Sequence, residues 1–368
     1  MISKLKSSLA LNLSNMKGWR TNRKIVVFES DDWGSIRMPS RSVFKALQRK
    51  GIPVEKSPYC RYDTLEDNQD LEHLFNILLD FKDINGNHPI ITANTVVANP
   101  KFSIIKESGY RVYAYEPFTE TLKGYPNHDK VFEYYQQGID NKIFYPQFHG
   151  REHVNVNLWL RLLKENKNFE LAFQNNMWGL SNDVFPNRKS IQATFDCFDN
   201  ERLSDSVNTG LELFENIFGY TSKSFIANNF IWSKALEKVL ASNGIKYIQG
   251  MRYQKLPTID GTSYKLIRHY LGEKNELNQI YGIRNSSFEP SVDGRGYRKT
   301  LSEIQNAFLW NKPAIISVHR INFIGGLSES NRSVNGFEFR KLLNEVIKKW
   351  PNVEFFNTVQ LNSIIRNE

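Results

Sequence analysis

Short apolar runs alternate along the chain with segments whose apolar residues recur at helical spacing. The apolar runs predict strands, because they are rich in β-branched or aromatic residues and end at polar or turn-forming residues. We expect strands at residues 25–28, 88–94, 144–148, 169–173, 190–195, 224–229, 246–249, 314–319 and 353–356. The helical spacing predicts helices at residues 41–50, 69–83, 129–138, 153–166, 203–218, 232–243, 336–349 and 358–366. Residues 251–312 carry no clear pattern of either kind.

This alternation predicts right-handed βαβ units and a largely parallel sheet. A closed or incomplete (β/α) barrel fits the strands better than an open dinucleotide-binding sheet, because no glycine-rich loop follows the first strand. Residues 95–142 form too long a segment for a bare loop and predict an insertion. We therefore expect one barrel domain over residues 24–368, preceded by an extension at residues 1–23.

The extension carries Ile2, Leu5, Leu9, Leu13 and Met16 at helical spacing, with lysines between them. This predicts an amphipathic helix that docks on the barrel; the alternative is weak association with a membrane surface. No apolar run approaches the length of about 20 residues that a membrane span needs, and no signal peptide is recognised. A cytoplasmic location is expected.

The amino-acid composition is consistent with the expected soluble barrel and cytoplasmic location but does not refine either. A hydrophobic content of 40% and a charged content of 24% are typical of a soluble globular protein. The net charge of +9 favours anionic partners, but no basic block or nucleic-acid motif is present, so nucleic-acid binding is not expected. Cys60 and Cys197 lack a metal-binding spacing and fit a reducing compartment.

Polar groups stand at the ends of several predicted strands. They are Asp31 with Asp32, His149 with His153, Asn228 with Asn229, and His319. Because the carboxyl ends of parallel strands meet at one mouth of a barrel, we expect these groups to converge there. A turn or a solvated surface is the alternative for each of them taken alone.

His149 and His153 are the most specific of these signals. Two histidines four positions apart can face the same ion, here with the first closing a strand and the second opening a helix. The usual zinc-peptidase order is absent, because Glu152 stands beside the second histidine. Asp32 is the natural third ligand, and such a set leaves positions open for water, as catalytic zinc requires.

The sequence resembles the polysaccharide deacetylases (NodB-homology domain, carbohydrate esterase family four) over roughly residues 24–360. The resemblance rests on the order Asp31-Asp32, His149-x-x-x-His153 and His319. It implies a distorted (β/α)7-type barrel with loop insertions and a divalent metal, usually zinc. This chain departs from the family at Trp33, which precedes Gly34, at Gly150, which replaces a hydroxyl residue, and at residues 224–230, which lack the family's Arg and Pro.

The resemblance also implies roles for individual residues. Asp32, His149 and His153 would hold the metal, Asp31 would act as general base and His319 as general acid. The implied reaction removes acetyl groups from N-acetylated or O-acetylated sugars of a polysaccharide or glycan precursor, with water activated by the metal. The residues themselves suggest further candidates: Asn228, Asn229 and Phe230 at the oxyanion, Trp33, Arg151 and Arg320 as substrate contacts, and Asp196 as a carboxylate that orients an imidazole. Solvated side chains are the alternative for the two arginines, and a turn is the alternative for Asp196.

Two other functions remain open from the sequence. One is a non-catalytic carbohydrate-binding or scaffolding protein on the same fold. The other is a glycoside hydrolase, which needs two carboxylates flanking the bond; Asp31 with Glu29 or Glu289 is the visible pairing.

Overall fold

The computed structural model describes residues 12–186, 189–196, 199–258 and 263–367. Its main sheet consists of parallel strands joined mostly through helices, as the sequence predicts. These strands are β1 (Lys24–Trp33), β2 (Ile91–Thr95), β5 (Phe144–Phe148), β6 (Ser224–Ile226), β7 (Tyr247–Gly250), β10 (Ile280–Ile283), β11 (Ser286–Ser287), β12 (Ala314–His319) and β13 (Val353–Phe356).

The sheet closes on itself as a distorted (β/α) barrel, which confirms the expected fold class. From β1 the pairing runs through β2, β5, β6 and β7 to β10 on one side, and through β12 to β11 on the other. β10 and β11 are successive parts of one segment, residues 280–287. This segment pairs first with β7 and then with β12, so it completes the ring. β13 pairs with the first half of β1 outside the ring.

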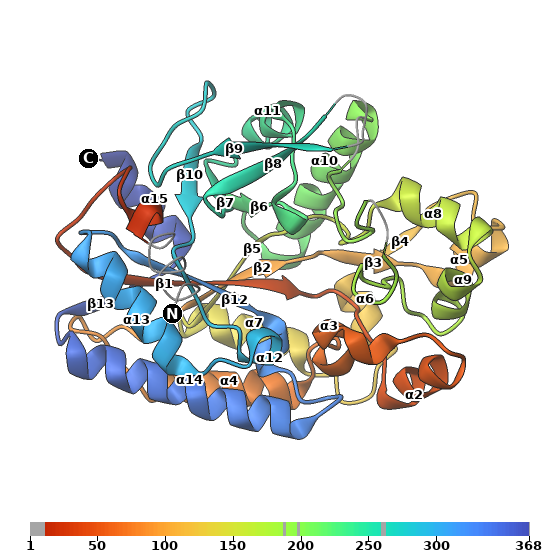
Figure 1. The fold of residues 1–368 in the computed structure, drawn as a ribbon, viewed down its shortest axis with the longest axis horizontal. Coiled ribbons are helices and arrows are strands. Elements are labelled where there is room, and N and C mark those ends of the chain that lie inside the picture. The colour runs from red at the N-terminus through yellow and green to blue at the C-terminus, as the bar shows by residue number, and fades with distance from the viewer. Residues whose placement is uncertain (1–11, 187–188, 197–198, 259–262, 368) are drawn as a thin grey trace, which may run out of the picture.

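Helices cover the outside of the barrel. Figure 1 shows α4, α13 and α14 along one flank and α10 and α11 along the opposite one. The α-helices are α2 (Arg41–Arg49), α3 (Pro58–Tyr62), α4 (Asn68–Leu79), α5 (Phe102–Glu107), α6 (Phe118–Leu122), α7 (Val131–Asp140), α8 (Val156–Glu165), α9 (Lys167–Phe173), α10 (Asn200–Phe218), α11 (Lys234–Ser242), α12 (Pro290–Asp293), α13 (Tyr297–Leu309), α14 (Glu329–Lys349) and α15 (Thr358–Asn367). The short 3-10 helices are η1 (Val54–Lys56), η2 (Asn228–Phe230) and η3 (Arg320–Phe323).

Local sequence signals set several helix ends. Asp67 and Asp70 form a reciprocal capping box at the start of α4, which satisfies two backbone N–H groups that the helix leaves free. The Asp199 side chain accepts from the Arg202 N–H at the start of α10. Gly219 ends α10 with a φ of 75°, a left-handed conformation that glycine adopts without a steric penalty.

Two antiparallel hairpins lie apart from the barrel. β3 (Ala98–Pro100) pairs with β4 (Tyr115–Pro117), and β8 (Tyr253–Pro257) pairs with β9 (Tyr264–Arg268). The first hairpin belongs to the insertion expected at residues 95–142, which also contains α5, α6 and α7. The second occupies part of the segment that carried no clear pattern.

Three local predictions are wrong. Residues 169–173 are helical, because Asn166 caps α9 and the short apolar run has no strand partner. Residues 190–195 form turns. The helix expected from residue 153 begins only at Val156, where Asn155 supplies the N-cap by accepting from the Leu158 N–H.

The alternation of β1 explains how the barrel delivers its polar groups. Val26 and Phe28 belong to an apolar cluster with residues of α4 and α14, whereas Ile25 and Val27 belong to a second cluster with residues of β6, β7 and β12. Glu29 and Asp31 continue the row of Ile25 and Val27, since side chains two positions apart share a face. One face of β1 therefore changes from apolar to acidic towards its carboxyl end.

The extension at residues 1–23 is described only from residue 12 onward, so the predicted amphipathic helix lies largely outside the described residues. Its described part packs on the barrel: Asn15 bonds to Asn285 and Asn306, and the buried Lys312 donates to the carbonyls of Lys17 and Gly18. Among the helices that the structure describes, none combines the length and apolar character needed to cross a membrane.

Candidate functional site

A bulge at the end of β1 separates two neighbouring carboxylates. The register between β1 and β2 shifts between Ser30 and Trp33, and Asp32 adopts a φ of 80°. A bulge breaks the strict alternation of side chains along a strand and is common beside active sites. Asp31 and Asp32 are both buried, yet each belongs to a different cluster of charged groups.

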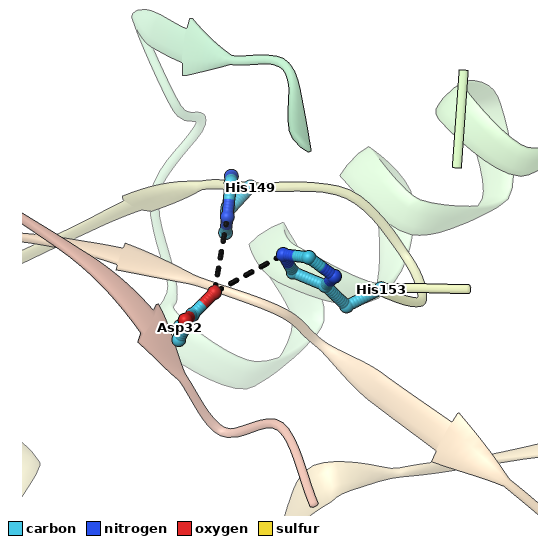
Figure 2. Close-up of side chains that lie close together, drawn as sticks. All are labelled: Asp32, His149 and His153. Atoms are coloured by element: carbon cyan, nitrogen blue, oxygen red, sulfur yellow. Dashed lines mark ion pairs between the residues drawn. The ribbon is translucent and has the colours of Figure 1, made fainter. Parts of the chain in front are cut away.

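Asp32 meets the two predicted histidines. Its Oδ1 lies 3.1 Å from Nε2 of His153 and 3.6 Å from Nε2 of His149. Figure 2 shows both imidazoles directed at the same carboxylate, although they follow a different strand from Asp32. One potential ligand atom from each residue lies within 4.8 Å of the others, and all three residues are buried.

The loop between the histidines has a different geometry from the predicted one. His149 follows β5, and His153 lies in the loop before α8, so a shared helical face does not bring them together. Gly150 turns the chain with a φ of 109°, and a Cβ at this position would lie 3.1 Å from the carbonyl oxygen of Glu152. A side chain at position 150, where the polysaccharide deacetylases carry a hydroxyl residue, would therefore be strained in this loop.

The environment suits both imidazoles to metal binding. His149 Nδ1 donates to the carbonyl of Ile226 at 2.9 Å, which leaves a lone pair on Nε2, the atom that faces Asp32. Burial and the nearby Arg37 lower the pKa of His153 to about 4, so this ring is neutral near pH 7. Its buried Nδ1 has no hydrogen-bond partner among the described residues. Two imidazoles and a carboxylate fit the donor set of a divalent-metal site.

Arg37 is a cation beside this cluster that the sequence did not single out. Its NH2 lies 2.9 Å from Oδ2 of Asp32 and 3.5 Å from Nε2 of His153. Burial opposes the ionisation of Asp32, but Arg37 and the neighbouring rings outweigh it and hold the pKa of Asp32 well below its usual value. The guanidinium also lies over the rings of Tyr59 and Trp178.

Asp31 forms the second cluster with Arg284. NH1 of Arg284 lies 2.6 Å from Oδ2 of Asp31 and NH2 lies 2.7 Å from Oδ1, while Nε bonds Glu29 at 2.8 Å. Asn94 adds a bond to Oδ1 at 2.8 Å. Although burial favours the neutral acid, Arg284 lowers the pKa of Asp31 to about 2. Arg284 thus holds Asp31 in its ionised form.

His319 lies between Asp31 and Glu289. Its Nδ1 is 2.6 Å from Oε1 of Glu289, and its Nε2 is 3.8 Å from Oδ2 of Asp31. Burial disfavours the charged ring, but Glu289 and Asp31 outweigh it and raise the pKa of His319 to about 10. Asn322 donates to the other oxygen of Glu289 at 2.7 Å. The His319 side chain is 25% exposed, so it is the accessible member of this cluster.

The predicted residues of segment 224–230 lie beside the histidines. Nδ2 of Asn228 lies 3.1 Å from Nε2 of His149. Asn229 and Phe230 have φ values of 56° and 58°, and both side chains are partly buried. Such positive φ values are strained for residues with a side chain and often mark functional loops.

Four other predicted residues have different surroundings from those expected. The Trp33 indole is buried against Phe144 and donates to Ser30, so its ring is part of the core. Arg320 is fully buried, 2.6 Å from Glu66 and 3.1 Å from Asp63, so this guanidinium cannot contact a substrate in the described conformation.

Asp196 and Arg151 also have other partners. Asp196 bonds Lys189 at 3.0 Å and the Tyr264 hydroxyl, whereas the orienting partner of His149 is a backbone carbonyl. Asp196 is therefore not the carboxylate that orients His149. Arg151 bonds Glu152 at 2.7 Å and Asp205 at 3.0 Å rather than Asp32.

The sequence matches the family model for glycosyl hydrolase family 57 over residues 180–317. This match indicates a carbohydrate-active enzyme. It overturns the expected deacetylase activity, because the matched family acts on glycosidic bonds, and it favours the glycoside hydrolase that was left open as an alternative. A comparison of the sequence with curated proteins finds no match.

Solved structures of several activities resemble this fold distantly. A probable polysaccharide deacetylase from Pseudomonas aeruginosa PAO1 is 9% identical, with a TM-score of 0.45, and the alignment covers 94% of this chain and 92% of that one. For a 4-alpha-glucanotransferase from Thermococcus litoralis the identity is 12% and the TM-score 0.42, with 93% and 40% of the two chains covered. Puue allantoinase is 9% identical, with a TM-score of 0.43, and the alignment covers 94% of this chain and 91% of that one. Similarity at this level does not distinguish one activity from another.

Proposed function

We propose that the protein hydrolyses or transfers glycosidic bonds of an oligosaccharide or polysaccharide at the mouth of the barrel. The observation that carries this proposal is the match to the glycosyl hydrolase family 57 model. The matched part of this chain, residues 180–317, includes Arg284 and Glu289. Both residues take part in the Asp31 and His319 cluster. The proposal therefore places the chemistry in that cluster.

Cleavage of a glycosidic bond needs a proton for the leaving oxygen and a carboxylate that meets the positive charge developing at the anomeric carbon. Asp31 suits the second role, because Arg284 keeps it ionised at neutral pH. His319 suits the first, because its raised pKa keeps the ring protonated and its side chain is partly exposed, with Nε2 3.8 Å from Asp31. Glu289 holds the other ring nitrogen, so its role would be to stabilise the proton on His319.

Glu29, the other carboxylate considered from the sequence, does not suit either role. It is fully buried, with Arg284 on one oxygen at 2.8 Å and the Thr358 hydroxyl on the other at 2.8 Å. Glu29 accepts a hydrogen bond from Nε of Arg284 and so fixes the guanidinium that holds Asp31. We assign Glu29 a positioning role.

We also propose that Asp32, His149 and His153 hold a divalent cation, most simply zinc. The donor set and the neutral state of His153 support this assignment. A bound cation of this kind supplies Lewis acidity and lowers the pKa of coordinated water. Arg37, bound to Oδ2 of Asp32, keeps that carboxylate ionised.

The test is an assay of the purified chain on a panel of α- and β-linked oligosaccharides and aryl glycosides. Reducing ends and transfer products are measured by chromatography, and acetate release is measured in parallel on acetylated sugars. We expect new reducing ends or longer transfer products from at least one substrate, and their loss in Asp31→Asn. Asp80→Asn is the matched control, because Asp80 forms an exposed ion pair with Arg340. Acetate release without any glycosidic product would overturn the proposal.

A further inference from the structure

A groove outside the two clusters lies between β4, the start of α10 and the loop that carries the histidines. It has a volume of about 480 Å³, within the range of small-molecule sites. Residues lining this groove include Tyr113, Tyr115, Arg151, Asp199, Arg202 and Asp205. Arg151 lies between His149 and His153 in the sequence, so the groove and the proposed metal site share one loop.

Tyr115 offers an aromatic surface that is held in place. The residue is 37% exposed, and the guanidinium of Arg151 lies 4.2 Å from the ring centroid. Arg151 is itself buried and is fixed by Glu152, Asp205 and Thr209. A ring immobilised on such a support loses little conformational entropy when a ligand packs against it.

Tyr113 adds an unsatisfied polar group. Its hydroxyl is buried and has no hydrogen-bond partner within the described part of the chain. The ring lies near that of Tyr115, with centroids 6.5 Å apart and planes 28° apart. A buried hydroxyl without a partner is costly, and a ligand that bonds to it after the Tyr113 side chain turns towards the groove removes this cost.

The charges of the groove select the ligand class. Three carboxylates, of Asp199, Glu201 and Asp205, line it together with two arginines. The charge of Arg151 is already offset by Glu152 and Asp205. With Asp205 paired to Arg151, Asp199 and Glu201 still outnumber the one other cation, Arg202. Carboxylates accept from hydroxyl groups but repel an anion, so the groove disfavours an acidic sugar and suits a neutral one.

We propose that this groove, here called the Tyr115 groove, is an accessory subsite that binds a neutral sugar unit of an extended glycan. The proposal rests on the proposed function for its substrate class. Arg151 points to α10 while the two imidazoles point to Asp32, so the subsite lies on the other side of their loop from the cluster. A chain that spans this loop would reach both places at once.

The test measures equilibrium binding by calorimetry, with maltotetraose, cellotetraose and chitotetraose as separate probes of the full chain. We expect at least one probe to bind and Tyr115→Ala to weaken its binding about tenfold, which corresponds to about 1.4 kcal/mol. Tyr253→Ala is the matched control: Tyr253 is 38% exposed and stacks on Arg252 at 4.6 Å, but does not line the groove. This control variant should bind like the wild type.

A second variant separates ligand binding from folding. Tyr113→Phe removes the unsatisfied hydroxyl, so we expect weaker sugar binding together with unchanged or increased stability to urea. Loss of a residue with a purely structural role would weaken binding only together with a loss of stability. Equal effects of Tyr115→Ala and Tyr253→Ala, or no binding of any probe, would overturn the subsite.

Binding needs no turnover, so the two proposals can fail separately. If no glycosidic bond is cleaved but Tyr115→Ala still weakens binding selectively, the proposed function fails and the subsite stands. If cleavage occurs and binding is the same in Tyr115→Ala and Tyr253→Ala, the subsite fails and the proposed function stands.

Discussion

The two terminal nitrogens of Arg284 each bond one carboxylate oxygen of Asp31, at 2.6 and 2.7 Å. This two-pronged ion pair joins β1 to the segment that closes the barrel. Both partners are buried, and the third guanidinium nitrogen is held by Glu29. The geometry fixes both the direction and the charge of the Asp31 carboxylate.

Arg284→Lys tests the importance of this geometry. Lysine keeps the charge but cannot make the two parallel bonds, so Asp31 would be held less firmly and its pKa would rise from about 2. We expect the rate of glycosidic cleavage to fall by about a hundredfold. We also expect the acid limb of the pH–rate profile to move to higher pH. Arg340→Lys, in a surface pair with Asp80, should change neither quantity.

The pH dependence of stability tests the charge on His319. Its pKa in the folded chain is about 10, above the value of about 6.5 expected in the unfolded chain. The resulting stabilisation is complete below about pH 6.5 and is lost as the pH rises to about 10. Urea unfolding across this window should show a declining free energy for the wild type and a smaller decline for His319→Gln.

His88→Gln is the control for that experiment, because His88 is a partly buried histidine away from both carboxylate clusters. Its profile should follow that of the wild type. A decline in His319→Gln as steep as in the wild type would mean that the ring is not protonated by its neighbours.

Metal binding tests the Asp32 cluster. We expect the wild type to retain about one equivalent of zinc per chain after dialysis, measured by mass spectrometry of the metal. His153→Ala should bind it at least about tenfold more weakly, because one of three ligands is lost. Asp31→Asn should keep the metal, since Arg284 and not the histidines holds Asp31. Equal zinc contents in wild type and His153→Ala would contradict the assignment.

Gly150→Ala tests the turn between the histidines. The φ of 109° strains any side chain, and the added Cβ would press on the Glu152 carbonyl, so we expect a loss of about 1–3 kcal/mol in stability and weaker zinc binding. Gly86→Ala is the matched control, because Gly86 also has a positive φ, of 81°, but no atom within 4 Å of the added Cβ. A similar effect of both changes on zinc binding would remove the special role of Gly150.

The sequence predicted the positions of the strand ends better than the surroundings of their side chains. Asp31, Asp32 and His319 stand where apolar strands end, and the parallel topology brings those ends to one mouth. Periodicity detects such strands because each is buried along its length. The run at residues 169–173 was misread, since five apolar-rich residues are too few to separate a strand from a helix.

The charged partners could not be predicted individually. Glu29 inside an apolar strand signals that some cation must pair with it, because a buried lone carboxylate is unfavourable. Nothing in the sequence identifies that cation as Arg284, which lies in the segment without a clear pattern. Arg37 was missed for a similar reason: its role depends on a contact with Asp32 that the chain makes only after folding.

Segment 280–287 closes the barrel through an ion pair as well as through backbone pairing. Arg284 lies between the stretch that pairs with β7 and the stretch that pairs with β12, and it holds Asp31 across the interior. Protonation of Asp31, as the pH falls from about 4 through about 2, would remove the negative charge from the Arg284–Asp31 ion pair. Because the pKa of Asp31 is so low, acid should loosen the ring at this segment only as the pH approaches about 2, and the same proton would neutralise the carboxylate proposed to be catalytic.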